Sequence, residues 1–132
     1  MDIIYINDIN KITIDMLSDN FFEGWSNKPS VQKHFDILQS SYVFWVALEN
    51  AKVIGFVNAV SDGILSAYIP LLEVLPEYRN KGIGGNLIKL MLESLSRLYM
   101  IDLCCDFKVQ DYYLKFGMQK SFSMIKRNYG TI

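Results

Sequence analysis

The sequence has little cysteine, histidine or net charge. Of its 132 residues, only Cys104, Cys105 and His34 offer thiol or imidazole ligands, so we expect neither a metal site nor a disulfide framework. Thirteen basic and fourteen acidic residues leave a net charge of −1, which argues against nucleic acid or an anionic membrane as a partner. Two adjacent cysteines that cannot build a framework are typical of a reducing compartment, so we expect a cytoplasmic protein.

Long apolar runs are also absent. No stretch approaches the ~20 apolar residues that a membrane-spanning helix needs, and the opening Met1-Asp2-Ile3 lacks the basic start of a signal peptide. What the chain does contain is 51% hydrophobic and 14% aromatic residues, which is enough for a packed core. We expect a single domain that spans residues 1–132.

Strand-like and helix-like patterns alternate along the chain. Period-two or short apolar runs predict strands, and apolar residues spaced by three and four predict helices. We expect a hairpin at Glu49-Asn50-Ala51-Lys52. The expected strands are 3–6, 42–48, 53–60, 64–74, 100–105 and 121–128, and the expected helices are 9–17, 29–38, 83–98 and 109–116.

The most distinctive segment joins the strand ending at Val74 to the helix beginning at Ile83. It reads Arg79-Asn80-Lys81-Gly82-Ile83-Gly84-Gly85-Asn86, with three glycines, two cations and no acid. A helix N-terminus presents unpaired N–H groups and the positive end of its dipole, and glycine lets an anion approach them. The segment therefore predicts a phosphate-binding loop built mainly from backbone amides.

Two familiar phosphate loops do not fit this segment. The nucleoside-triphosphate loop needs Lys-Ser or Lys-Thr after its glycines, and neither pair follows here. The dinucleotide fingerprint G-x-G-x-x-G begins at Gly82 and Gly84 but has Leu87 in place of its third glycine. What remains is R-x-x-G-x-G from Arg79, or a strand-to-helix turn that uses glycine only for its geometry.

A second motif follows at Asp111-Tyr112-Tyr113-Leu114-Lys115-Phe116-Gly117-Met118. With the glycine segment it resembles the GNAT superfamily of N-acetyltransferases. There, a strand, an [RQ]-x-x-G-x-[GA] loop and a helix cradle the pyrophosphate of acetyl-CoA, and an F-Y-x-x-x-G-F segment follows. Tyr112 replaces the first Phe and Met118 the last, and the resemblance is weak before Val53. It implies an α/β (α+β) fold with a mixed, mostly antiparallel sheet and helices on both faces.

The resemblance also implies a reaction, namely acetyl transfer from acetyl-CoA to an amine by direct attack in a ternary complex. Tyr113 stands where the family has a general acid for the leaving thiolate, although packing on an aromatic helix is the alternative. The Val74 N–H would polarise the thioester carbonyl. The residues implied in cofactor binding are Val74, Arg79, Asn80, Lys81, Gly82, Ile83, Gly84, Gly85 and Asn86.

The general base is less clear from the sequence. The family often uses a carboxylate on the strand before the glycine loop, but its usual position is Tyr68 here. Glu73 is the only carboxylate inside that strand, and simple alternation points it away from the Tyr68 face. A β-bulge would reverse that parity. Asp62 and Glu23 remain as alternatives, as does an amine that binds already neutral.

The acceptor is also left open by the sequence. By resemblance, the loop containing Glu23 and Trp25 forms a wall of the acceptor site, and the partners implied are a small-molecule or peptide amine in a monomer or homodimer. His34 lies in an apolar stripe, so we expect a core histidine. The rival functions are a non-catalytic acyl-CoA sensor of the same fold and a nucleotide-binding domain.

Overall fold

The structure is a computed structural model that describes residues 2–132. Its centre is a five-stranded sheet in the order β1-β2-β3-β4-β5. The first four strands pair antiparallel, and β5 pairs parallel to β4. The mixed, mostly antiparallel sheet is thereby confirmed. The strands are β1 (Ile4–Ile6), β2 (Val43–Glu49), β3 (Lys52–Ser61), β4 (Ser66–Val74) and β5 (Met100–Asp102).

The expected hairpin joins β2 to β3. Glu49 pairs with Lys52, and the two residues between them, Asn50 and Ala51, have φ angles of 50° and 63°. Two consecutive positive φ values are the signature of a type I′ turn, whose twist matches that of the flanking strands. This turn fixes the register of the two central strands.

A bulge interrupts β4 between Tyr68 and Glu73, so it decides whether these two side chains point to the same face of the sheet. The pairing runs Asn58 with Leu71 and then Val60 with Tyr68, so Ile69 and Pro70 together face one residue of β3. Proline is tolerated there because a bulged residue need not donate to the ladder. The extra residue puts Tyr68 and Glu73 on the same face of the sheet.

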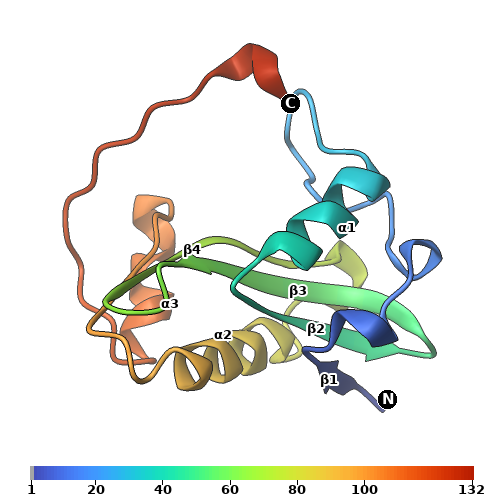
Figure 1. Ribbon diagram of the computed structural model, residues 1–132, viewed down its shortest axis with the longest axis horizontal. Helices are drawn as coiled ribbons and strands as arrows, with labels where there is room; N and C mark the ends of the chain where they lie inside the picture. Colours follow the sequence, from blue (N-terminus) through green and yellow to red (C-terminus); the bar gives the residue numbers. More distant parts are fainter. Residues whose placement is uncertain (1) are drawn as a thin grey trace.

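Helices cover both faces of the sheet, as expected. On one face, a Cβ on Gly55 of β3 would lie within 3.3 Å of Ile83 and Leu87, which belong to α2 (Ile83–Ser94). On the other, the ring of Phe56 lies 4.3 Å from the ring of His34, in α1 (Val31–Ser40). Figure 1 shows the two helices on opposite sides of the strands. No helix within residues 2–132 is long and apolar enough to cross a membrane.

The expected first helix, 9–17, is wrong. The chain forms two separate 3-10 turns there, Ile9–Lys11 and Ile14–Met16, with Ile12 extended between them. The Asp8 carboxylate accepts the Asn10 N–H at 3.0 Å. Short polar side chains that bond to nearby backbone in this way compete with a continuous helix.

The end of the chain also differs from expectation. The closing strand 121–128 does not form, β5 stops at Asp102 instead of 105, and the last helix is only α3 (Gln110–Leu114). Cys104 is half-buried and Cys105 is exposed, so they do not lie in a buried strand. Within the described chain no strand flanks the outer edge of β5, and residues 121–132, exposed throughout, have no strand partner for their backbone groups. In Figure 1 the final segment swings away from the sheet.

Candidate active site

The glycine loop leads into α2, as the sequence predicted. After the 3-10 turn Pro76–Tyr78, Asn80 and the helix N-cap Gly82 take φ angles of 63° and 82°. The first α-helical bond runs from the Asn86 N–H to the Gly82 carbonyl at 3.1 Å. The N–H groups of the preceding first turn therefore have no partner within the helix. With no acid in that turn, the helix end carries an uncompensated positive dipole.

Gly84 and Gly85 have a second reason to be glycine, which the sequence did not reveal. A Cβ on Gly84 would lie 3.3 Å from the Tyr112 hydroxyl oxygen, and a Cβ on Gly85 would lie 3.4 Å from it. These two adjacent glycines thus let the Tyr112 side chain of α3 approach the start of α2 at close range. Ile83 is buried in the core, so only its backbone faces the loop.

Two polar side chains of the loop, those of Arg79 and Asn86, are engaged with the fold, whereas Asn80 and Lys81 are exposed. The Arg79 Nε donates to the Val74 carbonyl at 3.1 Å, and its guanidinium lies 3.6 Å from the Glu23 carboxylate. The Asn86 amide donates to the Tyr5 hydroxyl at 2.9 Å. These bonds fix the loop against β1 and β4. The backbone amides and the exposed Lys81 ammonium, which lies 5.6 Å from the centre of the Tyr78 ring, are left to meet an anion.

The C-terminal half of β4 has an open edge beside this loop. β5 pairs with β4 only from Ser66 to Tyr68. The Leu75 N–H donates to the Ile54 carbonyl at 2.9 Å, and the alternation of an antiparallel ladder then points the Val74 N–H away from β3. That N–H faces the side that β5 leaves uncovered.

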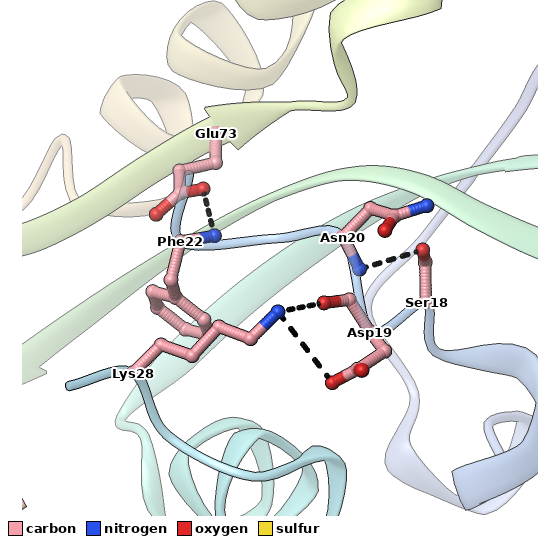
Figure 2. Close-up of polar contacts among 6 residues, drawn as sticks. All are labelled: Ser18, Asp19, Asn20, Phe22, Lys28 and Glu73. Carbon is pink, nitrogen blue, oxygen red and sulfur yellow. Dashed lines mark hydrogen bonds and ion pairs between the residues drawn. The ribbon is translucent and has the colours of Figure 1, made fainter. Parts of the chain in front are cut away.

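Glu73 lies on β4 immediately before this open position. Its Oε1 accepts the Phe22 N–H at 2.8 Å, across 51 residues of sequence, as Figure 2 shows. Burial raises the pKa of Glu73 above the usual carboxyl range, against the opposing effects of the Phe22 N–H and Arg79. A half-buried carboxylate with a raised pKa has the properties of a general base.

The partner of Glu73, Phe22, is a residue that sequence reasoning missed. Its φ of 64° is unusual for a bulky side chain, and its ring is buried beside Trp25 at 5.2 Å. The same segment is held in place by Lys28, whose ammonium group donates a hydrogen bond to the Asp19 carbonyl and forms an ion pair with the Asp19 carboxylate (Figure 2). Such strain is held only where surrounding contacts enforce it, and no local sequence pattern indicates it.

The other carboxylates considered as bases occupy different settings. Asp62 is exposed and accepts the N–H groups of Ile64, Leu65 and Ser66 at 2.9, 2.9 and 3.2 Å. These bonds lower the pKa of Asp62 and make it a turn-forming residue. Glu23 faces Arg79 and lies near enough to Glu73 to raise the pKa of that carboxyl. Glu73, Glu23, Arg79 and Val74 therefore form one cluster.

Tyr113 lies on α3, half-buried against the core. Burial raises its pKa to about 12, with smaller effects from Cys105 and Tyr112. Its ring stacks edge-on against the ring of Tyr112 at 5.3 Å, and its hydroxyl makes no hydrogen bond to residues 2–132. The phenol is therefore protonated at neutral pH and free to donate.

His34 is a core residue, as expected. Its ring packs edge-on against Phe21 and Phe22, and its Nε2 is buried with no partner among residues 2–132. Burial lowers the pKa of His34 to about 4. The imidazole is therefore neutral in the folded protein at neutral pH and has no role in the cluster around Glu73.

We expect His34 to make the protein less stable in acid. Its pKa of about 4 in the fold is below the 6.5 of the unfolded chain, so the unfolded state takes up a proton first. The free energy of unfolding should fall by about 2 kcal/mol between pH 7 and pH 5 from this group. Urea titrations at several pH values should show this loss in the wild type and a clearly smaller one in His34→Leu. Equal losses in both proteins would contradict it.

Comparison with known proteins places this arrangement in a family. Residues 11–118 match the family model of the Acetyltransferase (GNAT) family. A crystal structure from Deinococcus radiodurans R1, provisionally described as an acetyltransferase, is 42% identical with a TM-score of 0.93, covering 98% of this chain and 90% of that one. A GNAT-family acetyltransferase from Streptococcus pneumoniae TIGR4 is 26% identical with a TM-score of 0.77, covering 96% and 98%. An uncharacterized N-acetyltransferase of Pyropia yezoensis is 25% identical over 89% of this chain and 70% of its own length. The glycine loop and the Tyr-Tyr segment thus lie within a family match that spans most of the chain, which belongs to the GNAT family of acetyltransferases.

Proposed function

We propose that this protein transfers an acetyl group from acetyl-CoA to an amine acceptor by direct attack in a ternary complex. The observation that carries the proposal is the juxtaposition of three features: the unpaired amides at the start of α2, the open β4 edge at Val74, and Glu73 one residue earlier. Acetyl-CoA supplies an activated thioester and a pyrophosphate. The backbone from Lys81 to Gly85 would hold the pyrophosphate, because anions bind at helix N-termini.

The acceptor nitrogen, the carbonyl oxygen and the sulfur each then have a residue that takes a proton from, hydrogen-bonds to or protonates that atom. Glu73 takes a proton from the acceptor nitrogen, directly or through water, as the new C–N bond forms. The Val74 N–H donates to the carbonyl oxygen, where negative charge develops. Tyr113 gives its proton to the sulfur as the C–S bond breaks. Because burial raises the pKa of Tyr113 to about 12, this transfer is best concerted with bond cleavage, when the sulfur becomes basic.

The acceptor would approach from the segment that contains Glu23 and Trp25. Trp25 is 44% exposed while its ring packs edge-on against the buried Phe22, so it presents a fixed apolar surface. Glu23 lies exposed beside Arg79. An amine with an apolar part fits this pair better than a polyanion does. We place the reaction in the cytoplasm, where the free thiols of Cys104 and Cys105 would stay reduced.

We expect Gly82→Asp to weaken acetyl-CoA binding about tenfold relative to Gly82→Asn, or about 1.4 kcal/mol. A Cβ on Gly82 meets no atom within 4 Å, so both side chains have room. Asn and Asp tolerate the left-handed backbone of this position best, and both can cap the helix. The two variants therefore differ in the negative charge placed against the pyrophosphate. Isothermal titration calorimetry with acetyl-CoA measures the difference.

Equal affinities in the two variants would remove the pyrophosphate from the glycine loop. Turnover is measured separately, as thiol release from acetyl-CoA in a panel of amines. Tight acetyl-CoA binding without turnover of any amine would favour a non-catalytic acyl-CoA sensor instead of the enzyme.

A further inference from the structure

Phe22 has a backbone conformation that its own side chain disfavours. Its φ of 64° lies in the left-handed region, which bulky residues rarely adopt. The ring is buried, with its centroid 5.2 Å from those of His34 and Trp25 and 6.0 Å from that of Phe56. Such backbone strain persists only where neighbouring contacts enforce it, and it gathers at functional sites. The conformation therefore needs a reason beyond the burial of one ring.

The neighbouring Phe21 shows that packing alone does not require this conformation. Its ring belongs to the same aromatic cluster, 5.2 Å from the rings of His34 and Phe56, and it is as deeply buried. Phe21 nevertheless has no positive φ, and its N–H makes no hydrogen bond within residues 2–132. What distinguishes Phe22 is its N–H, which reaches the carboxylate of Glu73 (Figure 2).

The turn at Phe22 connects this carboxylate to the wall that contains Trp25. The Phe22 N–H donates to Glu73 Oε1 at 2.8 Å, and the Phe22 carbonyl accepts the Trp25 N–H at 3.2 Å. One residue therefore holds both the carboxylate of β4 and the turn that carries the exposed Trp25 ring. The second oxygen of the carboxylate, Oε2, accepts no hydrogen bond from residues 2–132, so it is free to meet an acceptor nitrogen.

The electrostatic setting gives the same bond a second effect. An N–H donor stabilises the ionised form of a carboxyl group, and here it is the strongest influence opposing the burial that raises the pKa of Glu73. Arg79 opposes that rise to a smaller extent, and the charge of Glu23 adds to it. The other side chains facing Glu73 or its partner are Phe56 of β3, which has no charge, Tyr68 of β4, and His34 of α1, which is neutral at neutral pH.

We propose that the Phe22 N–H is the positioning group of the general base in acetyl transfer. It fixes Oε1 of Glu73 so that Oε2 faces the acceptor amine, and it holds the base against the turn that carries Trp25. The strained backbone of Phe22 is enforced by its buried ring on one side and by the carboxylate on the other. This inference rests on the proposed function, in which Glu73 takes the proton from the acceptor.

Removing one N–H tests the proposal without disturbing the ring. Phenyllactic acid at position 22, introduced by nonsense suppression, replaces the amide with an ester that keeps the side chain and cannot donate to Glu73. Because the lost bond favours the ionised carboxylate, the pKa of Glu73 should rise. The deficit in kcat/KM relative to the wild type should then grow by about tenfold or more between pH 9 and pH 6, while the KM for acetyl-CoA stays unchanged. A deficit of the same size at every pH would overturn the proposal.

The same replacement at position 21 is the matched control. The Phe21 N–H has no partner within residues 2–132, so this ester removes an amide from the same turn and the same aromatic cluster. It should keep the wild-type kcat/KM across the whole pH range. Equal deficits in the two esters would reduce Phe22 to a packing residue.

A readout without turnover separates this proposal from the proposed function. The ¹³C signal of the Glu73 carboxyl, identified by its loss in Glu73→Gln, reports the titration of that group directly. Its midpoint should be higher in the Phe22 ester than in the wild type and unchanged in the Phe21 ester. An unchanged midpoint in the Phe22 ester would overturn the proposal even in an active enzyme. A wild type that acetylates no amine would instead remove the proposed reaction, and with it the catalytic role of Phe22, whatever the midpoint.

Discussion

Glu73→Gln is expected to lower kcat/KM by about 10²- to 10⁴-fold, the range for loss of a positioned general base. Glutamine keeps an oxygen that can accept the Phe22 N–H, which Glu73 binds at 2.8 Å, so the local backbone should hold. It cannot accept a proton from the amine. Affinity for acetyl-CoA should change little, because Glu73 points to the face opposite α2. Steady-state kinetics with saturating acetyl-CoA measures the loss.

The pH profile separates catalysis from structure. Burial raises the pKa of Glu73, so the wild type should lose activity on the acid side at a pH above the usual carboxyl range, as the base becomes protonated. The Glu73→Gln variant should not show this loss of activity on the acid side of its pH profile. The thermal stability of the variant should equal or exceed that of the wild type, since burying an amide costs less free energy than burying a carboxylate. Glu77→Gln, an exposed acid in the turn after β4, is the matched control and should retain full activity. An active Glu73→Gln enzyme would assign proton removal elsewhere.

Local sequence features were sufficient where short-range physics decides the structure. The helix start at Ile83 follows from glycines and unpaired amides within a few residues, and the turn at Asn50-Ala51 lies between strands that pair directly. The bulge at Ile69-Pro70 is within reach of the sequence as well, because proline in a paired strand requires relief. The bulge in the structure places the Glu73 side chain on the same face of the sheet as Tyr68, opposite to what simple alternation predicts.

Features that depend on distant contacts were not predictable in the same way. The Phe22–Glu73 bond joins positions 51 residues apart and needs a left-handed Phe22. The close approach of Tyr112 to Gly84 and Gly85 depends on how α3 packs. The expected closing strand 121–128 has the right alternation and still does not form, because alternation alone does not specify which edge of the sheet a segment will join.

Tyr113→Phe is expected to lower the rate of acetyl transfer by about 10²-fold or more. The substitution keeps the ring that packs on the core and stacks on Tyr112, and removes only the proton donor. Because the Tyr113 hydroxyl makes no hydrogen bond within residues 2–132, its loss leaves no buried partner unsatisfied. Folding and acetyl-CoA affinity should therefore stay near wild type, while kcat falls.

The leaving group provides a test that packing could not imitate. Acyl donors whose thiol is more acidic need less help to depart, so the deficit of Tyr113→Phe should shrink with them. Tyr112→Phe serves as a comparison with a different expected result. Its hydroxyl lies against Gly84 and Gly85, so removing it should disturb the glycine loop and raise the KM for acetyl-CoA, with little effect on kcat. If Tyr113→Phe instead turned over at the wild-type rate while chemistry limits the reaction, solvent would be the proton source and Tyr113 only a packing residue.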